Sequence, residues 1–492
     1  MEKSRILINK KVVEKTRRVE VTGDIIVPDI KPDIINIINT NGNPYIYKED
    51  ISDERLRVDG NIDTYVVYLS DNGETRSMQT SISFIETIEE SAIKTGMSAK
   101  TKVVIESIET KALNERKISI KANLKIKAEF FEKAEVEILE ELEEVKNIEK
   151  LKENLNVKSI IGINTAKTSI REDIAIDNNL QLAEIIKTNI EITNIENKIS
   201  YNKVLAKADA NIKIIFLTED ERIQVVETTI PIMSFVDVEN ITEEHICQTD
   251  YIIRNMLIKA NSKEMHSINC QVDFEVCCEA YETRNIEIIQ DMYSIKEDIV
   301  FSKKEVEVQI DGNEKEERIK LAENVIVEDV NTILDVDCMP IILNTNKIGN
   351  FTNYEGEVKL DFYYEADNRN GLNVKSVKIP FIAKLEMQEE NIEISVYKKQ
   401  FKVNNENVEC DIELIVKQSN RSLKKVSIIE NIETKPMEEE NDYKMYIYFV
   451  KAGDTIWKIA KRFKVCMEDI IQFNKLENPN KLNIGDRLYI MR

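Results

Sequence analysis

Cysteine, histidine and acidic residues are the side chains of this sequence that could bind a metal or take part in catalysis. The adjacent thiols of Cys277 and Cys278 would suit a metal ion or a redox pair. Zinc sites, however, usually need C-x-x-C spacing together with further cysteine or histidine ligands. The strand pattern places Cys270, Cys278 and Cys410 on apolar faces, where a thiol packs as a small hydrophobic group. We therefore interpret these cysteines as structural.

The remaining candidates for chemistry are sparse. The chain has two histidines, His245 and His266, and neither has a companion pattern of ligands or catalytic partners. The sequence lacks a phosphate-binding glycine loop, a dinucleotide fingerprint, a nucleophile elbow and an H-E-x-x-H zinc motif. We expect a protein that is not an enzyme and needs no cofactor or metal. An enzyme concealed in the repeats described below is the alternative.

Length and charge limit the function classes further. A chain of 492 residues predicts three or four domains. Its net charge of −22 disfavours nucleic acid and anionic membranes as partners. The sequence shows neither a secretory signal nor an apolar run of membrane-spanning length, so we expect a cytoplasmic protein without membrane insertion. Its seven cysteines, an odd number, fit a reducing compartment better than a disulfide framework.

A pattern of about 150 residues occurs three times. The strings "EVTGDIIVPDI", "TSIREDIAIDN" and "IKLAENVIVED" place Ile25, Ile174 and Val325 at equivalent positions. Each string is followed by an alternating run, a short polar turn and a second apolar run. The first of these turns contains Asp71-Asn72-Gly73, a good hairpin signal because Asn and Gly tolerate positive φ.

The clearest strand signal comes near the end of each repeat, where apolar and polar residues alternate. The apolar positions are Ile118, Ile120, Ala122, Leu124, Ile126, Ala128 and Phe130 in repeat 1, Ile268, Cys270, Val272, Phe274, Val276 and Cys278 in repeat 2, and Val408, Cys410, Ile412, Leu414 and Val416 in repeat 3. Period two predicts one buried and one solvated face, as in an antiparallel sheet. Each repeat is therefore expected to be a β-sandwich or barrel-like domain.

Composition suggests where the domains meet. A stretch rich in Glu, Lys and Leu reads as an amphipathic helix, and a short acidic stretch with a proline reads as a linker. The predicted parts are repeat 1 at 1–132, a helical connector at 133–156, repeat 2 at 157–300, repeat 3 at 301–433, an acidic linker at 434–445 and a last domain at 446–492.

The last domain differs from the rest, since it carries nine basic and five acidic residues. "YIYFV" predicts a strand, Thr455 is placed to cap a helix, and "CMEDIIQFNKL" predicts a second helix before a closing strand. The first helix has one apolar stripe, formed by Ile456, Ile459, Ala460 and Phe463. The order is β-α-α-β.

This segment resembles the LysM domain. The matching residues are Val450, Gly453, Asp454, Thr455, Ile456, Ile459, Ala460, Phe463, Asn474, Asn478, Pro479, Leu482 and Gly485. One departure is Cys466, where the family often has a capping Ser or Thr, so the second helix should have a weaker cap. The resemblance implies a groove for N-acetylglucosamine glycans, formed here by Gly453, Asp454, Thr455, Ile456, Asn478, Pro479, Asn480, Lys481 and Leu482.

A protein partner is the other expectation for this domain. Trp457, the only tryptophan of the chain, lies off the apolar stripe beside a basic row, and we expect its side chain to be exposed. Aromatic and basic residues often anchor interfaces and steer acidic partners. The predicted partner-binding residues are Trp457, Lys458, Lys461, Arg462 and Ile456. The alternative is that Trp457 packs internally, against Phe449 or the opposite helix.

The whole chain resembles clostridial spore-coat morphogenetic proteins of the SipL type. The repeats, with "VPDIKPD" opening the first, resemble the SPOCS domain, and a single LysM domain follows them. The resemblance implies a scaffold in the mother-cell cytoplasm, at the forespore surface. Its LysM domain would bind SpoIVA, the ATPase of the coat's basement layer, and other coat proteins could join. A glycan-binding protein of the cortex or cell-wall peptidoglycan is the alternative.

Overall fold

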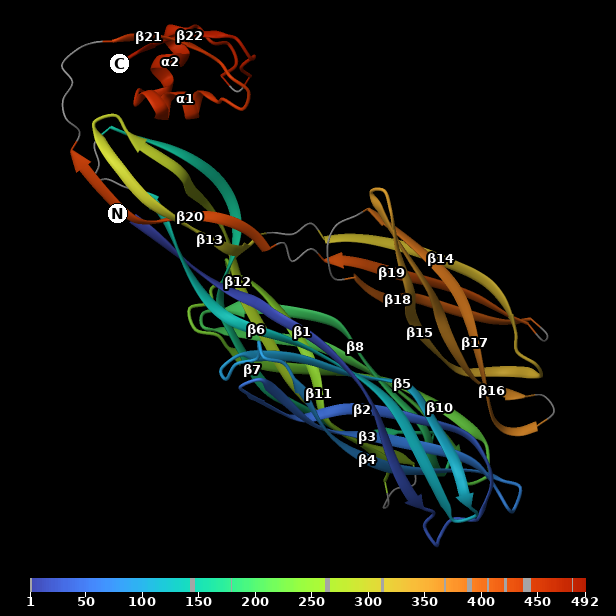
Figure 1. Cartoon of the computed structure of the whole chain (residues 1–492). Helices are drawn as coiled ribbons and strands as arrows, with labels where there is room; N and C mark the ends of the chain where they lie inside the picture. Colours follow the sequence, from blue (N-terminus) through green and yellow to red (C-terminus); the bar gives the residue numbers. More distant parts are fainter. Residues whose placement is uncertain are drawn as a thin grey trace.

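The computed structural model consists mainly of antiparallel strands, and its helices lie near the C-terminus, as expected (Figure 1). The residues it describes are 2–141, 147–177, 179–261, 266–310, 314–366, 369–386, 392–404, 407–419, 423–436, 444–479 and 481–492. Within these residues, no helix is both long and apolar enough to cross a membrane.

Each of the three repeats is a sandwich of two three-stranded sheets. Repeat 1 pairs the sheets β1-β6-β5 and β2-β3-β4, repeat 2 pairs β7-β12-β11 and β8-β9-β10, and repeat 3 pairs β14-β19-β18 and β15-β16-β17. The strands of repeat 1 are β1 (Glu2–Ile26), β2 (Ile34–Ser52), β3 (Arg55–Ser70), β4 (Thr75–Glu89), β5 (Ser98–Asn114) and β6 (Lys117–Glu141). Those of repeat 2 are β7 (Ile148–Ala175), β8 (Leu182–Ser200), β9 (Lys203–Thr218), β10 (Ile223–Asp237), β11 (Ile246–Ala260) and β12 (Ser267–Ser294). Those of repeat 3 are β14 (Glu314–Ile326), β15 (Val330–Ile348), β16 (Phe351–Ala366), β17 (Arg369–Glu386), β18 (Ile392–Asn404) and β19 (Asn407–Ser419).

The strand pairing confirms the predicted repeat. Ile25 lies opposite Ile118, Ile174 lies opposite Ile268, and Val325 occupies the same place in repeat 3. The alternating apolar residues of β6, β12 and β19 form the inner layer of each sandwich, and each of them is at most 1% exposed. Period two in the sequence therefore identified the buried face of the central strand in all three repeats.

The segment 133–156, which we expected to be a helical connector, is strand wherever the structure describes it. Its first part continues β6 and its last part opens β7, while 142–146 lie outside the described residues. Its Glu, Lys and Leu content favours helix locally. Val136, Ile138 and Leu155 are nevertheless buried against neighbouring strands. The helix prediction was wrong because tertiary pairing overrides local propensity.

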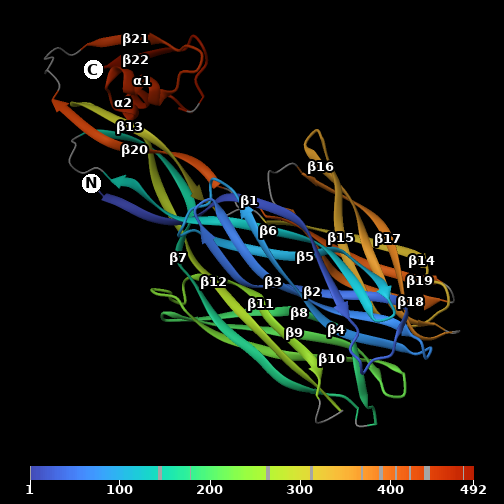
Figure 2. The same cartoon turned by 60° about the horizontal axis from the view of Figure 1, so that its bottom comes forward.

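The long strands extend beyond the sandwiches as three two-stranded ribbons, β1–β6, β7–β12 and β13–β20 (Figures 1 and 2). The strands of the third ribbon are β13 (Glu297–Gln309) and β20 (Leu423–Pro436). All three ribbons share one apolar core, whose buried members are Ile6, Ile8, Val136, Ile138, Leu155, Val157, Ile286, Ile288, Val308, Val426 and Ile428. We call this shared assembly the ribbon bundle.

The ribbon bundle corrects the predicted domain limits. The boundaries at 132, 157, 300 and 433 fall inside β6, β7, β13 and β20 rather than between elements. The predicted linker 434–445 also begins within β20, and most of its remainder lies outside the described residues.

The last domain contains β21 (Met445–Phe449), α1 (Ile456–Phe463), α2 (Met467–Phe473) and β22 (Arg487–Met491). The strands β21 and β22 pair antiparallel, so the predicted β-α-α-β order is confirmed. Figures 1 and 2 both show this domain beyond the ends of the ribbons.

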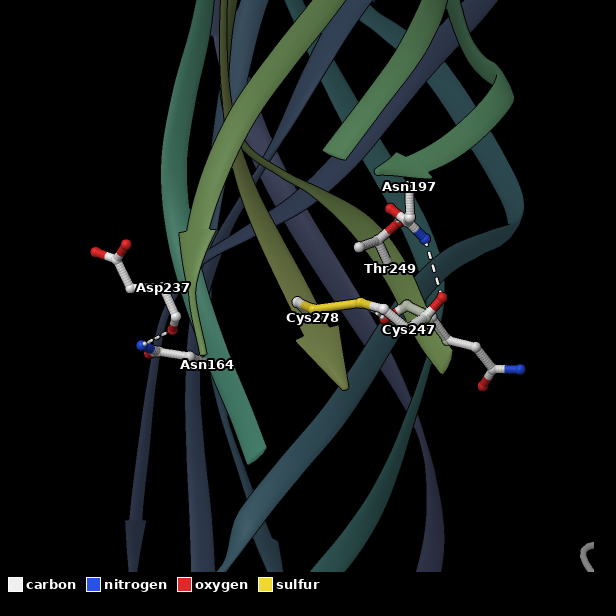
Figure 3. Close-up of a disulfide and its surroundings, with 7 residues drawn as sticks. Asn164, Asn197, Asp237, Cys247, Thr249 and Cys278 are labelled. Atoms are coloured by element: carbon white, nitrogen blue, oxygen red, sulfur yellow. Dashed lines mark hydrogen bonds between the residues drawn. A yellow bond between two sulfur atoms is a disulfide. The ribbon is translucent and has the colours of Figure 1, made fainter. Parts of the chain in front are cut away.

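A disulfide joins Cys247 of β11 to Cys278 of β12 (Figure 3). This corrects our expectation that Cys278 packs as a free thiol. Thr249 lies opposite Cys278, so Cys247 is a diagonal neighbour, with the two Cα atoms 6.6 Å apart. The other two thiols assigned to apolar faces, Cys270 and Cys410, are buried and free, as predicted.

Candidate functional site

The first helix of the last domain forms as its sequence predicts. The backbone N–H of Lys458 donates to Oγ1 of Thr455 at 3.2 Å, which caps α1. Ile456, Ile459 and Ala460 of the predicted apolar stripe are buried. At the start of α2, Cys466 makes no capping hydrogen bond through its side chain, so the weaker cap expected there is confirmed.

Trp457 is buried, not exposed as we expected. Its ring meets the edge of the Tyr293 ring, with centroids 5.1 Å apart and planes at 64°. Its indole Nε1 donates a hydrogen bond to Oδ2 of Asp291 at 2.9 Å. Both partners belong to β12, so the residues that cover Trp457 come from the ribbon of repeat 2. The alternative of internal packing holds in part, because Trp457 also belongs to the buried core of the last domain, together with Ile470 of the opposite helix. Phe449 is exposed and is not a member of that core.

The carboxylate of Asp291 interacts with the side chains of both Trp457 and Lys461. Nζ of Lys461 lies 2.6 Å from Oδ1 of Asp291, so the carboxylate accepts from both side chains of α1. Burial alone would raise the pKa of Asp291, but the hydrogen bonds from Lys461 and Trp457 outweigh burial and hold this pKa below its ordinary value. The ammonium group of Lys461 also lies 5.4 Å from the centre of the Phe301 ring.

Two further contacts hold the last domain on the ribbon bundle. The Tyr293 hydroxyl donates to the backbone oxygen of Val465 at 2.8 Å. Burial raises the pKa of Tyr293 well above its ordinary value, so this hydroxyl stays protonated and can donate. Lys464 forms an ion pair with Asp298 of β13.

Sequence reasoning did not find Asp291, Tyr293 and Asp298. They are far from α1 along the chain, and no local pattern distinguishes them from other acidic or aromatic residues of the strands. Only the fold brings them together with the last domain.

The remaining predicted partner residues contact their own domain. Nζ of Lys458 donates to the backbone oxygen of Gly453 at 2.8 Å. Nη1 of Arg462 donates to the Tyr448 hydroxyl at 3.3 Å. Lys458 and Arg462 are exposed, whereas Ile456 is buried. Of the five predicted partner-binding residues, two are therefore exposed to solvent, one is buried in the domain core, and Trp457 and Lys461 contact β12.

The two halves of the predicted glycan groove line one cavity of about 780 Å³. The turn contributes Asp454, Thr455 and Ile456, and the later loop contributes Pro479 and Leu482. The opposite wall belongs to the ribbon bundle and includes Leu151, Glu153, Gln290, Asp291, Lys303, Glu305, Lys425, Val426 and Ser427. The groove therefore faces other parts of the same chain.

Other members of the predicted groove are placed differently. Gly453, Asn478 and Lys481 are exposed, and Asn480 lies outside the described residues. The carboxylate of Asp454 accepts from the backbone N–H of Lys451 and from the Tyr448 hydroxyl, each at 2.8 Å. These bonds fix the turn before α1.

Two family models match the chain. Residues 448–490 match the model described as LysM domain, and residues 33–113 and 181–261 match the model described as SipL, SPOCS domain. This is a SipL-like architecture. SPOCS is a spore-coat domain and LysM a glycan-binding one, so the chain is a sporulation protein associated with the coat. No curated protein and no solved structure is significantly similar to the chain.

The SPOCS matches have a structural meaning. The first covers β2 to β5 and the second covers β8 to β11, four consecutive strands of repeat 1 and of repeat 2. The long strands that build the first two ribbons, β1, β6, β7 and β12, lie outside the matched segments. Repeat 3 has the same strand order in β14 to β19, so it shares the architecture without a match to the SPOCS model.

No metal site is evident in the described part of the chain. Within it, no group of three or more histidine, cysteine or acidic side chains is arranged to hold an ion. SPOCS and LysM domains bind or assemble rather than catalyse, which agrees with the few candidate catalytic residues in the sequence.

Proposed function

We propose that the protein is a non-catalytic scaffold for spore-coat morphogenesis. In this proposal it works in the mother-cell cytoplasm at the forespore surface, where its LysM domain docks onto SpoIVA, the ATPase of the coat's basement layer. The observation that carries the proposal is the combination of two SPOCS segments and a LysM domain in one chain. The SPOCS sandwiches provide repeated surfaces for other coat proteins, and the LysM domain provides the anchor.

Charge supports a protein partner for the LysM domain. From Tyr446 to Arg492 the chain carries nine basic and five acidic residues, although the whole chain has a net charge of −22. The exposed Lys458 and Arg462 would steer an acidic surface toward α1. Trp457 and Lys461 would then form the centre of the interface once the contact with β12 is released.

Glycan binding is the second candidate function. The observation in its favour is the cavity that unites the turn at Asp454 and Thr455 with the loop at Pro479 and Leu482. Because the ribbon bundle forms its opposite wall, a glycan would have to enter between the LysM domain and the bundle. The bundle covers Trp457 in the same way, so the release that exposes the protein-docking surface would open this groove as well.

Copurification of the full chain with the purified basement-layer ATPase tests the proposal. Trp457→Ala and Lys461→Glu should each lose the ATPase. Lys475→Glu makes the same charge change at an exposed residue after α2, and it should retain binding. If both α1 variants keep the ATPase while the wild-type chain binds N-acetylglucosamine oligosaccharides tightly, the glycan alternative replaces the docking proposal.

A fluorescent fusion tests the location. During sporulation it should form a ring around the forespore. A fusion that stays diffuse in the mother cell would contradict the proposed place of action.

A further inference from the structure

The surface of α1 presents a set of complementary groups to one short stretch of β12. The indole N–H of Trp457 and the ammonium group of Lys461 converge on a single carboxylate, at 2.9 Å and 2.6 Å. The backbone oxygen of Val465 accepts a phenol hydroxyl at 2.8 Å. A carboxylate and an aromatic ring are therefore bound side by side.

The spacing of the bound groups follows from strand geometry. Asp291 and Tyr293 are two residues apart, so their side chains project from the same face of β12. Met292, between them, points the other way and is buried with Leu139 and Ile429 in the apolar layer of the ribbons. A register shift between β12 and β7 lies directly before Asp291. The LysM surface thus contacts a carboxylate-x-aromatic sequence in an extended strand.

We propose that this LysM surface recognises extended segments carrying a carboxylate two residues before an aromatic ring, and that Asp291-Met292-Tyr293 is the chain's internal copy of that ligand. The inference rests on the proposed function in one respect: the partner that docks on α1 presents the same sequence chemistry and displaces β12. The structure then represents a closed state, in which the docking surface is occupied by the protein itself.

The hydrogen bonds made by Asp291 and Tyr293 would be exchanged for equivalent ones, whereas the ion pair of Lys464 with Asp298 would be given up. An external segment would offer Trp457 and Lys461 the same carboxylate and, where its aromatic residue is tyrosine, would offer Val465 the same hydroxyl. Displacement by a tyrosine-containing segment therefore leaves none of these three groups unpaired on the LysM domain, which makes exchange easier than simple opening. The sandwiches and the ribbon bundle keep their own cores in the process, because Met292 stays buried with its neighbours.

The only tryptophan of the chain reports the closed state directly. In the full chain, Asp291→Ala combined with Tyr293→Ala should shift the Trp457 emission to the red and raise its quenching by acrylamide several-fold. Glu287→Ala is the matched control, because Glu287 is an exposed residue of the same strand whose carboxylate pairs with Lys152. Circular dichroism should show the same strand content in both variants. Unchanged emission in the double variant would overturn the closed state.

A peptide tests the recognition itself without the ATPase. The probe is a labelled peptide with the sequence of residues 286–297, and the receptor is the full chain carrying Asp291→Ala and Tyr293→Ala. Binding should be at least tenfold tighter to this opened variant than to the wild type. A peptide with alanine at positions 291 and 293 should bind at least tenfold more weakly. Equal binding of both peptides, or no binding to the opened variant, would overturn the recognition rule.

Binding of the purified ATPase is the last test of this proposal. The opened variant should bind the purified ATPase several-fold more tightly than the wild type does. The displacement step is wrong if the opened variant binds the peptide but the wild type binds the ATPase at least as tightly as the opened variant does. If neither form binds the ATPase while the peptide binds as expected, the docking proposal fails and the recognition rule stands.

Discussion

Gly60 of β3 lies directly opposite Phe84 of β4, and a methyl group added at residue 60 would lie 2.3 Å from Cζ of that ring. Repeat 3 has the same pair in Gly356 and Phe381, where the corresponding distance is 2.4 Å. Repeat 2 has Ala208 opposite Ile232 at this place. Each repeat therefore fills the same volume, either with a glycine under a ring or with an alanine beside an aliphatic side chain.

The first prediction exploits this difference between repeats. Gly60→Ala should destabilise the chain by about 1–3 kcal/mol, because the added methyl group overpacks a buried site. Adding Phe84→Ile should recover part of that loss, since it recreates the pair of repeat 2. Chemical unfolding followed by circular dichroism measures both changes. The added methyl group would also lie 2.5 Å from the backbone oxygen of Tyr45, so a neutral Gly60→Ala variant would show that both the ring and this backbone move aside at little cost.

The second prediction concerns the contact between repeats 2 and 3. Nζ of Lys187 lies 2.7 Å from both Asp335 and Asp337, and it lies 3.9 Å from the centre of the Tyr363 ring. Lys187 and Asp335 are buried. Lys187→Ala would leave Asp335 with a single cation, and loss of one partner from a buried pair typically costs about 3–5 kcal/mol.

Equilibrium urea unfolding checks this prediction. Lys203→Ala is the control, because its partner Asp237 is exposed and exposed pairs contribute about 0–1 kcal/mol. Equal effects of the two substitutions would mean that Lys187 contributes no more than a surface pair.

The third prediction is a pH dependence of the closed state. The pKa of Asp291 is held below its ordinary value, so docking favours the ionised carboxylate. The resulting stabilisation is present above the ordinary pKa of a free Asp, about 3.9, and is lost as the pH falls through the lower docked value. Trp457 emission should therefore stay constant from pH 8 to pH 5 and shift to the red in more acidic solution.

Asp291→Asn is the control for that titration. This substitution removes the titrating carboxylate. The Trp457 emission of the variant should therefore not change at the pH where that of the wild type changes, provided that circular dichroism shows the sandwiches intact. A transition of equal size in the variant would assign the effect to another carboxylate.

The fourth prediction concerns the cysteines. Burial raises the pKa of Cys270 and Cys338 to about 11 and that of Cys410 to about 12. Few thiolates are then present at pH 8, and Cys270 and Cys410 are buried as well, so alkylation in the native state should be slow. Mass spectrometry after labelling should find Cys270 and Cys410 modified only after denaturation, and half-buried Cys338 modified slowly in the native state. Cys247 and Cys278 should become reactive only after denaturation followed by reduction of their disulfide. Rapid labelling of Cys410 in the native protein would contradict its assignment as buried.

The sequence revealed those features that depend on neighbours in the chain. Alternation in β6, β12 and β19 identified their buried faces, and Thr455 identified the start of α1. The segment 133–156 was misread because its composition favours helix, while its strand form depends on pairing with distant strands. The exposure of Trp457 was misjudged for the same reason, since Tyr293 and Asp291 cover it from another repeat. The disulfide also joins residues of different strands, which spacing alone does not pair.

The ribbon bundle has a consequence for the order of folding. Its core combines Ile6, from β1, with Ile428, from β20. Contacts between such distant residues form late, while each sandwich can fold as soon as its own strands exist. The LysM domain then settles on the finished tip of this bundle, against Tyr293. A truncated chain that ended within repeat 3 would lack both the third ribbon and the LysM domain, so under the proposed function incomplete polypeptides would be excluded from assembly at its first step.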